Sequence, residues 1–295
     1  MTSLREELED AIALAEEISA RDPDFASRAE ALAFLDSHVF DRLADSGIIT
    51  IPPDLRTIEA RGRSLQRRLD AANAHTAQEI RARIVSKTLV GPELARTLLH
   101  HAGSGEEAHG YSMLDLLVGM LLDSGAPSDL RVPLEKEMVA YQPTPARAIL
   151  EAIAQAPIRS DDVFCDLGSG LGWVVMLVAL ITGARCKGVE LEPTYVELSR
   201  RCARVLDVPN AEFVTGDLLQ APLSEATIYF SYTPLRGALL RRLIERLHAE
   251  AMKRPIRICS LGPCTNDFLS TRWLTRSNDG AISDHEIALF HSVKT

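Results

Sequence analysis

The sequence has no apolar stretch long enough to cross a membrane. Its longest unbroken apolar run, Trp173 to Ile181, falls well short of the roughly 20 residues that a bilayer-spanning helix needs. The first residues, MTSLREELEDA, are acidic, whereas a secretory signal carries positive charge ahead of an apolar stretch. We therefore expect a cytoplasmic protein with no membrane partner.

Cysteine is sparse, and its spacing excludes the usual cysteine-based sites. The five cysteines are an odd number, and they lie at positions 165, 186, 202, 259 and 264. This spacing fits neither a disulfide framework nor a zinc site. We expect reduced thiols that mostly fill the core.

One other cluster imitates a metal site around a Gly-Ser turn. Its members are His100, His101, Glu106, Glu107 and His109. Real metal sites need converging ligands with supported geometry, and a flexible turn between polar helix ends yields the same letters. We expect no metal here.

An excess of basic residues is also missing. The chain has 32 Lys and Arg against 41 Asp and Glu, and residues 141–295 carry 17 of each sign, so the acidic excess lies in residues 1–140. Proteins that bind nucleic acid by neutralising phosphates usually show a basic domain or stripe, so we expect no nucleic-acid partner. The one basic cluster comprises Arg56, Arg61, Arg63, Arg67, Arg68, Arg81 and Arg83. Its acidic neighbours favour a solvated helix face over a docking patch.

Residues 4 to about 134 read as a set of helices, because their apolar positions recur at helical spacing. Five or six helices fit between the breakers, which are Asp22-Pro23, Pro52-Pro53, Gly91-Pro92, Gly103 to Gly105 and Gly125 to Pro127. Ser112 precedes one apolar face and is the expected N-cap of that helix. We predict an all-α N-terminal domain over residues 1–137, which could support a homo-oligomer.

After Ala140 the pattern changes to short β-branched runs that alternate with helical stretches. The expected strands are Val163 to Asp166, Arg185 to Leu191, Ala211 to Thr215, Ala226 to Tyr232, Pro255 to Leu261 and Glu286 to Val293. Such alternation predicts an α/β domain over residues 138–295, with a mostly parallel sheet and helices on both faces. Ligand chemistry should then gather at the carboxyl ends of the strands.

The first expected strand runs directly into a glycine-rich turn. Gly168, Gly170 and Gly172 stand between that strand and an apolar helix that starts at Trp173. Glycine lets the backbone approach a ligand closely, so a nucleoside cofactor fits here. The dinucleotide fingerprint would need its third glycine at 173. We expect Trp173 to belong to the core.

Acidic residues follow three successive strands. Asp166 stands beside the glycine turn, where a carboxylate repels a pyrophosphate but suits the sulfonium and ammonium groups of S-adenosylmethionine (SAM). Glu190 ends the second strand and can accept from both ribose hydroxyls. Asp217 follows the third and can accept from the adenine amino group. Together they predict SAM rather than NAD.

The runs DLGSGLG, GVELE and GD resemble the motifs of class I SAM-dependent methyltransferases. More narrowly, YQPTPARAILEAI followed by FCDLGSGLGWVVMLVALITGARCKGVELEP resembles the disruptor-of-telomeric-silencing family of histone-lysine methyltransferases. The resemblance covers roughly residues 138–235 and implies a Rossmann-like, seven-stranded sheet. It also implies that Tyr141 and Thr144 form a loop that closes over the methionine end of the cofactor. The cofactor site it implies, with neighbouring positions added, is Tyr141, Thr144, Asp166, Gly168, Ser169, Gly170, Gly172, Glu190, Leu191, Asp217 and Leu218.

Three positions depart from that family. Trp173 replaces a Gln, Leu218 replaces a Phe, and the segment Tyr229 to Pro234 lacks the Asn that the family places beside the target amine. The family's basic chromatin-binding tail is also missing, so a histone substrate does not carry over. We expect Ser231, Tyr232 and Thr233 on the acceptor side, with Tyr141 closing from the other. Tyr232 orients a nucleophile, accepts its proton through water, stacks on an apolar substrate, or only anchors its loop.

These observations predict a SAM-dependent methyltransferase that acts on a nitrogen or oxygen nucleophile. The acceptor is a protein lysine or a small-molecule amine or hydroxyl. Methyl transfer from a sulfonium is an in-line displacement that depends on positioning and desolvation more than on a strong acid or base. The alternative is a non-catalytic SAM-binding or scaffold protein that acts through its helical domain.

Overall fold

The structure is a computed structural model that describes residues 3–21, 24–47, 51–103, 112–123, 125, 130–277 and 283–293. It divides into two compact units. The first comprises Met1–Arg83, Thr97–Glu107 and Ser112–Leu121, and the second comprises Ile84–Arg96, Ala108–Tyr111 and Leu122–Thr295. The second unit thus takes in Ile84–Arg96 and residues 122–137 in addition to the predicted α/β domain. A single domain boundary at residue 137 stays a prediction.

Predicted breakers separate the first, fourth, fifth and sixth α-helices from their neighbours, whereas the second α-helix, a π-helix and the third α-helix follow one another without a break. The helices before residue 123 are α1 (Leu4–Arg21), α2 (Phe25–Leu35), the π-helix η1 (Asp36–Phe40), α3 (Asp41–Asp45), α4 (Pro53–Val85), α5 (Pro92–Ala102) and α6 (Met113–Leu122). Proline opens α4 and α5 because a first-turn position needs no backbone N–H. Ser112 caps α6 as expected, since its Oγ accepts from the Leu114 N–H at 3.2 Å and the Asp115 carboxylate accepts from the Ser112 N–H at 2.6 Å.

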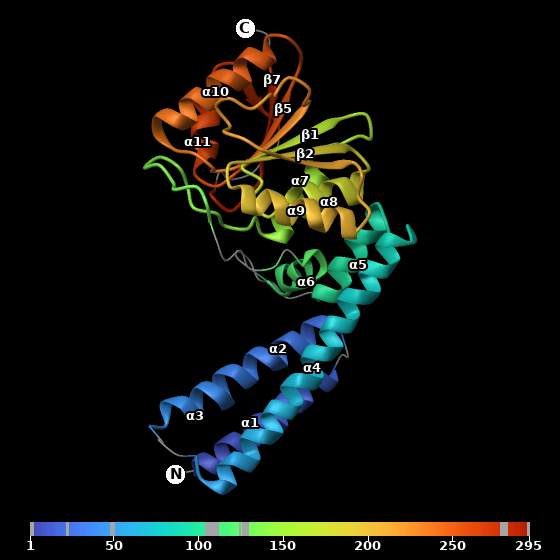
Figure 1. Ribbon diagram of the computed structural model, residues 1–295, viewed down its shortest axis with the longest axis vertical. Coiled ribbons are helices and arrows are strands. Elements are labelled where there is room, and N and C mark those ends of the chain that lie inside the picture. Colours follow the sequence, from blue (N-terminus) through green and yellow to red (C-terminus); the bar gives the residue numbers. More distant parts are fainter. Residues whose placement is uncertain are drawn as a thin grey trace. The chain divides into compact units, whose positions relative to one another are not determined.

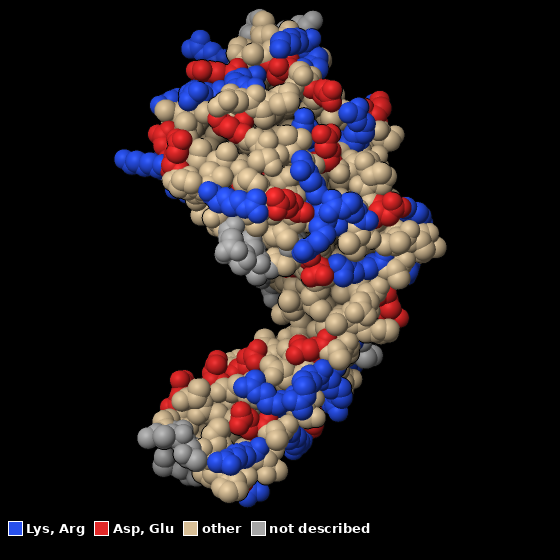
Figure 2. Space-filling view, viewed as in Figure 1, with Lys and Arg blue, Asp and Glu red and all other residues tan. Residues whose placement is uncertain are grey.

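The arginine cluster of α4 lies on a solvated face. Arg61 pairs with Glu16 at 2.8 Å, and the guanidinium of Arg63 stacks 3.6 Å from the ring centroid of Phe40. Basic and acidic side chains are interspersed over the viewed face of each unit (Figure 2). This agrees with the expected helix face laced by opposite charges.

The second unit is built on a seven-stranded sheet with the order β3-β2-β1-β4-β5-β7-β6. Its strands are β1 (Val163–Leu167), β2 (Arg185–Glu190), β3 (Ala211–Thr215), β4 (Ile228–Tyr232), β5 (Arg257–Leu261), β6 (Leu274–Arg276) and β7 (Ala288–Ser292). The first five strands are parallel, and β7 is antiparallel to β5 and β6. The predicted seven-stranded, mostly parallel sheet is confirmed. The six-run reading of the sequence missed only β6, a three-residue strand.

Helices cover both faces of this sheet (Figure 1). One face carries α7 (Ala146–Gln155), α8 (Trp173–Thr182) and α9 (Pro193–Val205), and the other carries α10 (Gly237–Ala251) and α11 (Cys264–Leu269). Residues 174–181 of α8 are all buried, which explains the apolar run as a core helix. None of the described helices combines the length and apolarity that a membrane crossing requires.

All five cysteines are buried and free, as the sequence predicts. Burial raises the pKa of the Cys165 thiol to about 12, so it stays protonated. Within the described residues, no three His, Cys, Asp or Glu side chains gather as a metal-binding group. Glu106, Glu107 and His109 of the metal-like cluster lie outside the described residues.

The strand order reverses between β1 and β4, because β2 and β3 lie on one side of β1 and β4 and β5 on the other. Loops that leave two such strands diverge to opposite faces of the sheet and open a crevice at their carboxyl ends. The glycine turn follows β1 at this point, and Thr233 follows β4.

Candidate active site

A cavity of about 530 Å³ opens at the carboxyl ends of β1, β2, β3 and β4. Its walls carry four carboxylates, from Asp166, Glu190, Glu192 and Asp217. Three of the five tyrosines of the chain also line it, namely Tyr141, Tyr195 and Tyr232. In a chain with 5% aromatic residues, this concentration marks the cavity as the chemically distinct part of the second unit.

The glycine turn brings backbone to the cavity floor. The N–H groups of Gly168 and Ser169 both donate to the carbonyl of Val189, at 2.9 and 3.1 Å, which folds the turn against β2. Gly170 has φ +49° and faces Tyr141, whose ring would overlap any Cβ at this position. Glycine is therefore required at 170 by both conformation and space.

The four predicted contacts in the glycine turn fall into two pairs. Gly168 and Ser169 line the cavity, but Gly170 and Gly172 do not. A Cβ on Gly172 would lie 2.5 Å from the Phe213 ring, so this glycine allows close helix–strand packing instead. The last two glycines shape the turn and leave the contact with a ligand to their neighbours.

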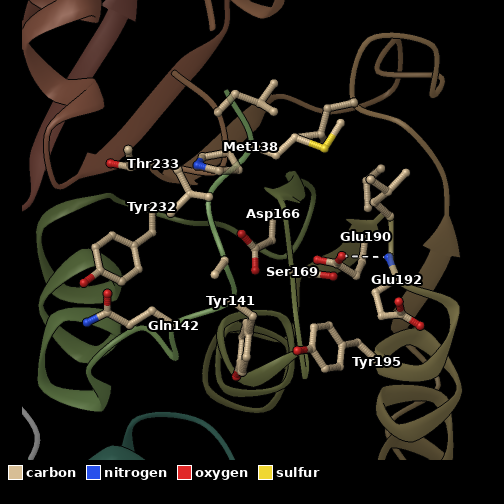
Figure 3. A pocket seen from close by; sticks show the side chains of 18 of the residues that line it. Met138, Tyr141, Gln142, Asp166, Ser169, Glu190, Glu192, Tyr195, Tyr232 and Thr233 are labelled. Carbon is tan, nitrogen blue, oxygen red and sulfur yellow. Dashed lines mark hydrogen bonds between the residues drawn. The ribbon is translucent and has the colours of Figure 1, made fainter. Parts of the chain in front are cut away.

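Asp166 lies in the middle of the cavity (Figure 3). The residue is only 3% exposed. Burial, and then the nearby Glu190 carboxylate, raise the pKa of Asp166 to about 8. A buried acid of this kind is stabilised as an anion only when a cation enters beside it.

Both oxygens of the Glu190 carboxylate accept backbone hydrogen bonds. Its Oε2 accepts from the Gly170 N–H at 2.8 Å, and its Oε1 accepts from the Glu192 N–H at 2.9 Å. Burial raises the pKa of Glu190, and these N–H groups partly offset the rise. A carboxylate has about four acceptor positions, so acceptor capacity remains for a hydroxyl group in the cavity.

Asp217, which follows β3, also lines the cavity, as does Thr144 of the predicted lid, the loop that contains Tyr141 and Thr144. Asp217 accepts from the Leu219 N–H at 2.8 Å and from the Gln220 amide at 3.1 Å. Thr144, Leu191 and Leu218 stand on the walls as predicted positions. The assigned cofactor contacts other than Gly170 and Gly172 thus converge on one cavity.

Two buried polar atoms on the walls have no hydrogen-bond partner within the described part of the chain. They are Oγ of Ser169 and Nε1 of Trp173. An unpaired buried donor is costly, and a polar ligand would satisfy it. The expectation that Trp173 belongs to the core is therefore wrong, because the residue is only half-buried and lines the cavity.

The end of β4 separates the three acceptor-side residues. Tyr232 lines the cavity on the opposite side of Asp166 from Glu190 (Figure 3). Ser231 is fully buried, does not line the cavity, and places its hydroxyl 3.8 Å from the Cys264 sulfur. The prediction placed Ser231 on the acceptor side, but strand alternation turns its side chain away from Tyr232 and from the cavity.

Thr233 lines the cavity, but its hydroxyl bonds to protein. Its Oγ1 donates to the Leu261 carbonyl and accepts from the Cys264 N–H, both at 3.2 Å. These bonds hold a residue with φ +45°, an uncommon backbone conformation outside glycine. The threonine shapes the loop that presents Tyr232.

Sequence reasoning missed Tyr195 and Glu192. Tyr195 packs against Tyr141 with ring centroids 5.0 Å apart. Tyr195 and Glu192 lie at the start of α9, where Glu192 is the N-cap and its carboxylate accepts from the Thr194 N–H. The signal was present, since a helix that begins directly after a ligand-binding strand end directs its first turn toward the same crevice.

Comparisons with known proteins point in one direction. Residues 138–213 match the family model described as histone methylation protein DOT1. No match was found among the curated proteins. The matched segment contains the lid motif, the glycine turn and the first two strands.

Solved structures that match the chain include two methyltransferases. An RNA methyltransferase from Salinibacter ruber, in complex with S-adenosyl-L-homocysteine, is 28% identical over 51% of this chain and 92% of its own, with a TM-score of 0.40. A geranyl diphosphate C-methyltransferase from Streptomyces coelicolor A3(2) is 22% identical over 39% of this chain and 44% of its own, with a TM-score of 0.33. A mutant of MtNAS is 12% identical over 100% of this chain and 99% of its own, with a TM-score of 0.43.

The family match and the sheet order agree with the motifs in the sequence. The predicted resemblance to class I SAM-dependent methyltransferases, and within them to the histone methylation protein DOT1, is confirmed over residues 138–213. With it the expected enzyme class, a SAM-dependent methyltransferase, and the expected cofactor, SAM, are confirmed.

Proposed function

We propose that the protein transfers a methyl group from SAM to a nitrogen or oxygen nucleophile of a protein lysine or of a small-molecule amine or hydroxyl. The observation that carries this proposal is the convergence of Asp166, Glu190 and Asp217 on one cavity. Each has acceptor capacity left after its protein contacts. The set matches the cationic end, the ribose and the adenine amino group of SAM in the order of the strands.

The residues present fit this cofactor. The Asp166 carboxylate suits a sulfonium or an ammonium, because its own ionisation needs a positive neighbour. The unpaired Ser169 hydroxyl and Trp173 indole offer further donors. SAM, when bound, supplies an electrophilic methyl group on a sulfonium. Tyr141, Tyr195 and Thr144 cover that end of the cavity and exclude water.

The lining of the cavity as a whole favours cationic over anionic ligands. Arg236 is the one Lys or Arg among the described residues that line the cavity, against four carboxylates. Such a lining attracts cationic groups. An amine must lose its proton before it attacks, and burial beside a positive charge lowers the amine pKa without a dedicated base.

The direct test is product formation with defined acceptors. We expect the protein to form S-adenosylhomocysteine from SAM in the presence of amine or hydroxyl metabolites or of lysine-containing protein. RNA is included as an acceptor, and we expect no turnover with it. Tight SAM binding without turnover on any of these acceptors would favour the non-catalytic alternative.

Replacing Glu190 with Ala should weaken SAM binding by about 1.5 to 3 kcal/mol, the range for hydrogen bonds to a charged group. Both ribose hydroxyls lose their acceptor, and Gly170 loses an anchor. Calorimetry measures the effect. Glu225→Ala is the control, because Glu225 makes only an exposed pair with Arg185 at the far end of β2. Unchanged affinity in a folded Glu190 variant would contradict the assignment.

Replacing Tyr232 with Phe should lower kcat by about 3- to 10-fold and leave the SAM affinity unchanged. The phenol orients the acceptor by one hydrogen bond, and the ring that lines the cavity stays in place. Steady-state kinetics with both substrates varied separate the two effects. A loss above about 100-fold would show that the phenol relays a proton instead.

A further inference from the structure

A segment without a helix or a named strand, residues 130–141, forms one wall of the cavity, and we call it the strap. Its residues on that wall are Leu130, Val132, Leu134, Met138, Val139, Ala140 and Tyr141. Leu130 is 59% exposed and Leu134 is 55% exposed. Burial of apolar side chains therefore does little to hold the first part of the strap.

Backbone hydrogen bonds hold the second part of the strap. The Val139 N–H donates to the Pro234 carbonyl at 3.1 Å, and the Arg236 N–H donates to the Glu137 carbonyl at 2.8 Å. The Glu137 carboxylate also accepts from the Leu239 N–H at 3.0 Å, at the start of α10. This part is joined to the loop after β4.

One side chain holds the first part of the strap. Oε2 of Glu192 accepts from the N–H groups of Arg131 and Val132, at 2.7 and 2.9 Å. Its Oε1 accepts from the Thr194 N–H at 2.9 Å. The residue is 6% exposed, and its carboxylate points away from the centre of the cavity (Figure 3).

The charge of this carboxylate is secure. Burial opposes ionisation, but the hydrogen bonds from Thr194, Val132 and Arg131 outweigh it and lower the pKa of Glu192 to about 2. Hydrogen bonds to a charged group are the stronger kind. All three N–H groups would lack this partner if the side chain were neutral or shorter.

We propose that Glu192 is a positioning residue that latches the first part of the strap to the start of α9 and so prepares the cofactor site. The proposal rests on the proposed function, since it assumes that SAM is the ligand. The Glu192 carboxylate accepts hydrogen bonds from protein N–H groups and not from the ligand. Its effect on ligand binding is therefore transmitted through the strap.

The other contact at this end is too weak to replace the latch. Arg131 pairs with Glu197 at 3.2 Å, and both side chains are more than half exposed. Exposed pairs of this kind add little stability and are screened by salt. Without Glu192 the strap would have to be ordered by the ligand, and that ordering would reduce the apparent affinity.

Replacing Glu192 with Asp separates the two jobs of the side chain. Asp is a favoured N-cap, so α9 keeps its start, but the shorter side chain cannot reach Arg131 and Val132 as well. We expect faster hydrogen exchange at residues 130–136 of the ligand-free protein, about tenfold weaker S-adenosylhomocysteine binding, and a raised KM for SAM with kcat within twofold.

Two further variants complete the test. Glu192→Gln, which keeps the length but loses the charge, should show the same losses in smaller measure, and it carries the test if the Asp variant fails to fold. Glu197→Gln removes the exposed partner of Arg131 and should leave exchange and affinity unchanged.

The outcomes distinguish the latch from the proposed function. Wild-type strap exchange and affinity in both Glu192 variants would overturn the latch. A wild-type protein that binds neither SAM nor S-adenosylhomocysteine would overturn the proposed function, while strap exchange in the ligand-free variants would still decide whether Glu192 holds residues 131 and 132.

Discussion

Replacing Gly170 with Ala is expected to reduce SAM affinity by at least about 100-fold. The new Cβ would overlap the ring of Tyr141, and the residue would have to keep φ +49°. A left-handed conformation costs an ordinary residue about 1–2 kcal/mol. The larger effect is the displacement of Tyr141 from the wall of the cavity. Calorimetry with SAM measures the loss.

Gly183 provides the matched control for that experiment. It also has a positive φ, +72°, but a Cβ there would have no heavy atom within 4 Å. Gly183→Ala should therefore cost about 1 kcal/mol of stability through backbone strain and leave SAM affinity unchanged. Adding Tyr141→Ala to the Gly170 variant should cause no further loss. If Gly170→Ala keeps the wild-type affinity for SAM, the position of Tyr141 in the cavity wall does not depend on its contact with this turn.

Replacing Asp166 with Asn should weaken SAM binding by about 100-fold or more, because one partner of a buried charge pair is lost. The same change should stabilise the ligand-free protein at pH 7. The folded-state pKa of Asp166 is raised to about 8, well above the unfolded value of about 3.9, so folding requires uptake of a proton above pH 4. An amide removes that requirement.

The stability of the ligand-free protein should depend on pH through the same residue. Stability associated with a raised carboxyl pKa is fully present below about pH 4 and is lost as the pH rises to about 8. Asp166 should thus lower the stability of the ligand-free protein by up to about 1.4 kcal/mol per pH unit in this window. SAM affinity should rise over the same range. Urea unfolding and calorimetry at pH 5 to 8, compared with Asp166→Asn, measure both slopes, and slopes that persist in the variant would assign them to another group.

Sequence patterns predicted most of the sheet because buried parallel strands contain short, mostly apolar runs. Val163 to Leu167 and Arg257 to Leu261 are two examples, and each is a strand. The sequence did not predict the strand Leu274 to Arg276, because three residues that include a polar Thr and Arg carry no periodic signal. It becomes a strand only because β7 offers it an antiparallel partner.

Predicting the site from sequence succeeded where position along a strand fixes a side chain. Asp166 and Glu190 end parallel neighbours, so they had to meet. The sequence did not show that Ser231 faces the core, because a shift of one residue along the strand decides whether a side chain faces the cavity or the core. It also missed Glu192, whose partners lie about 60 residues earlier in a segment without periodic structure.

The buried cysteines have a practical consequence for measuring the strap. A thiol reacts through its thiolate, and burial keeps all five native cysteines out of reach of solvent reagents. A cysteine introduced at an exposed position such as Leu134 would therefore be labelled far faster than any native thiol. Because the native cysteines remain unlabelled, the signal of a single fluorophore on the strap reports the motion of the strap alone.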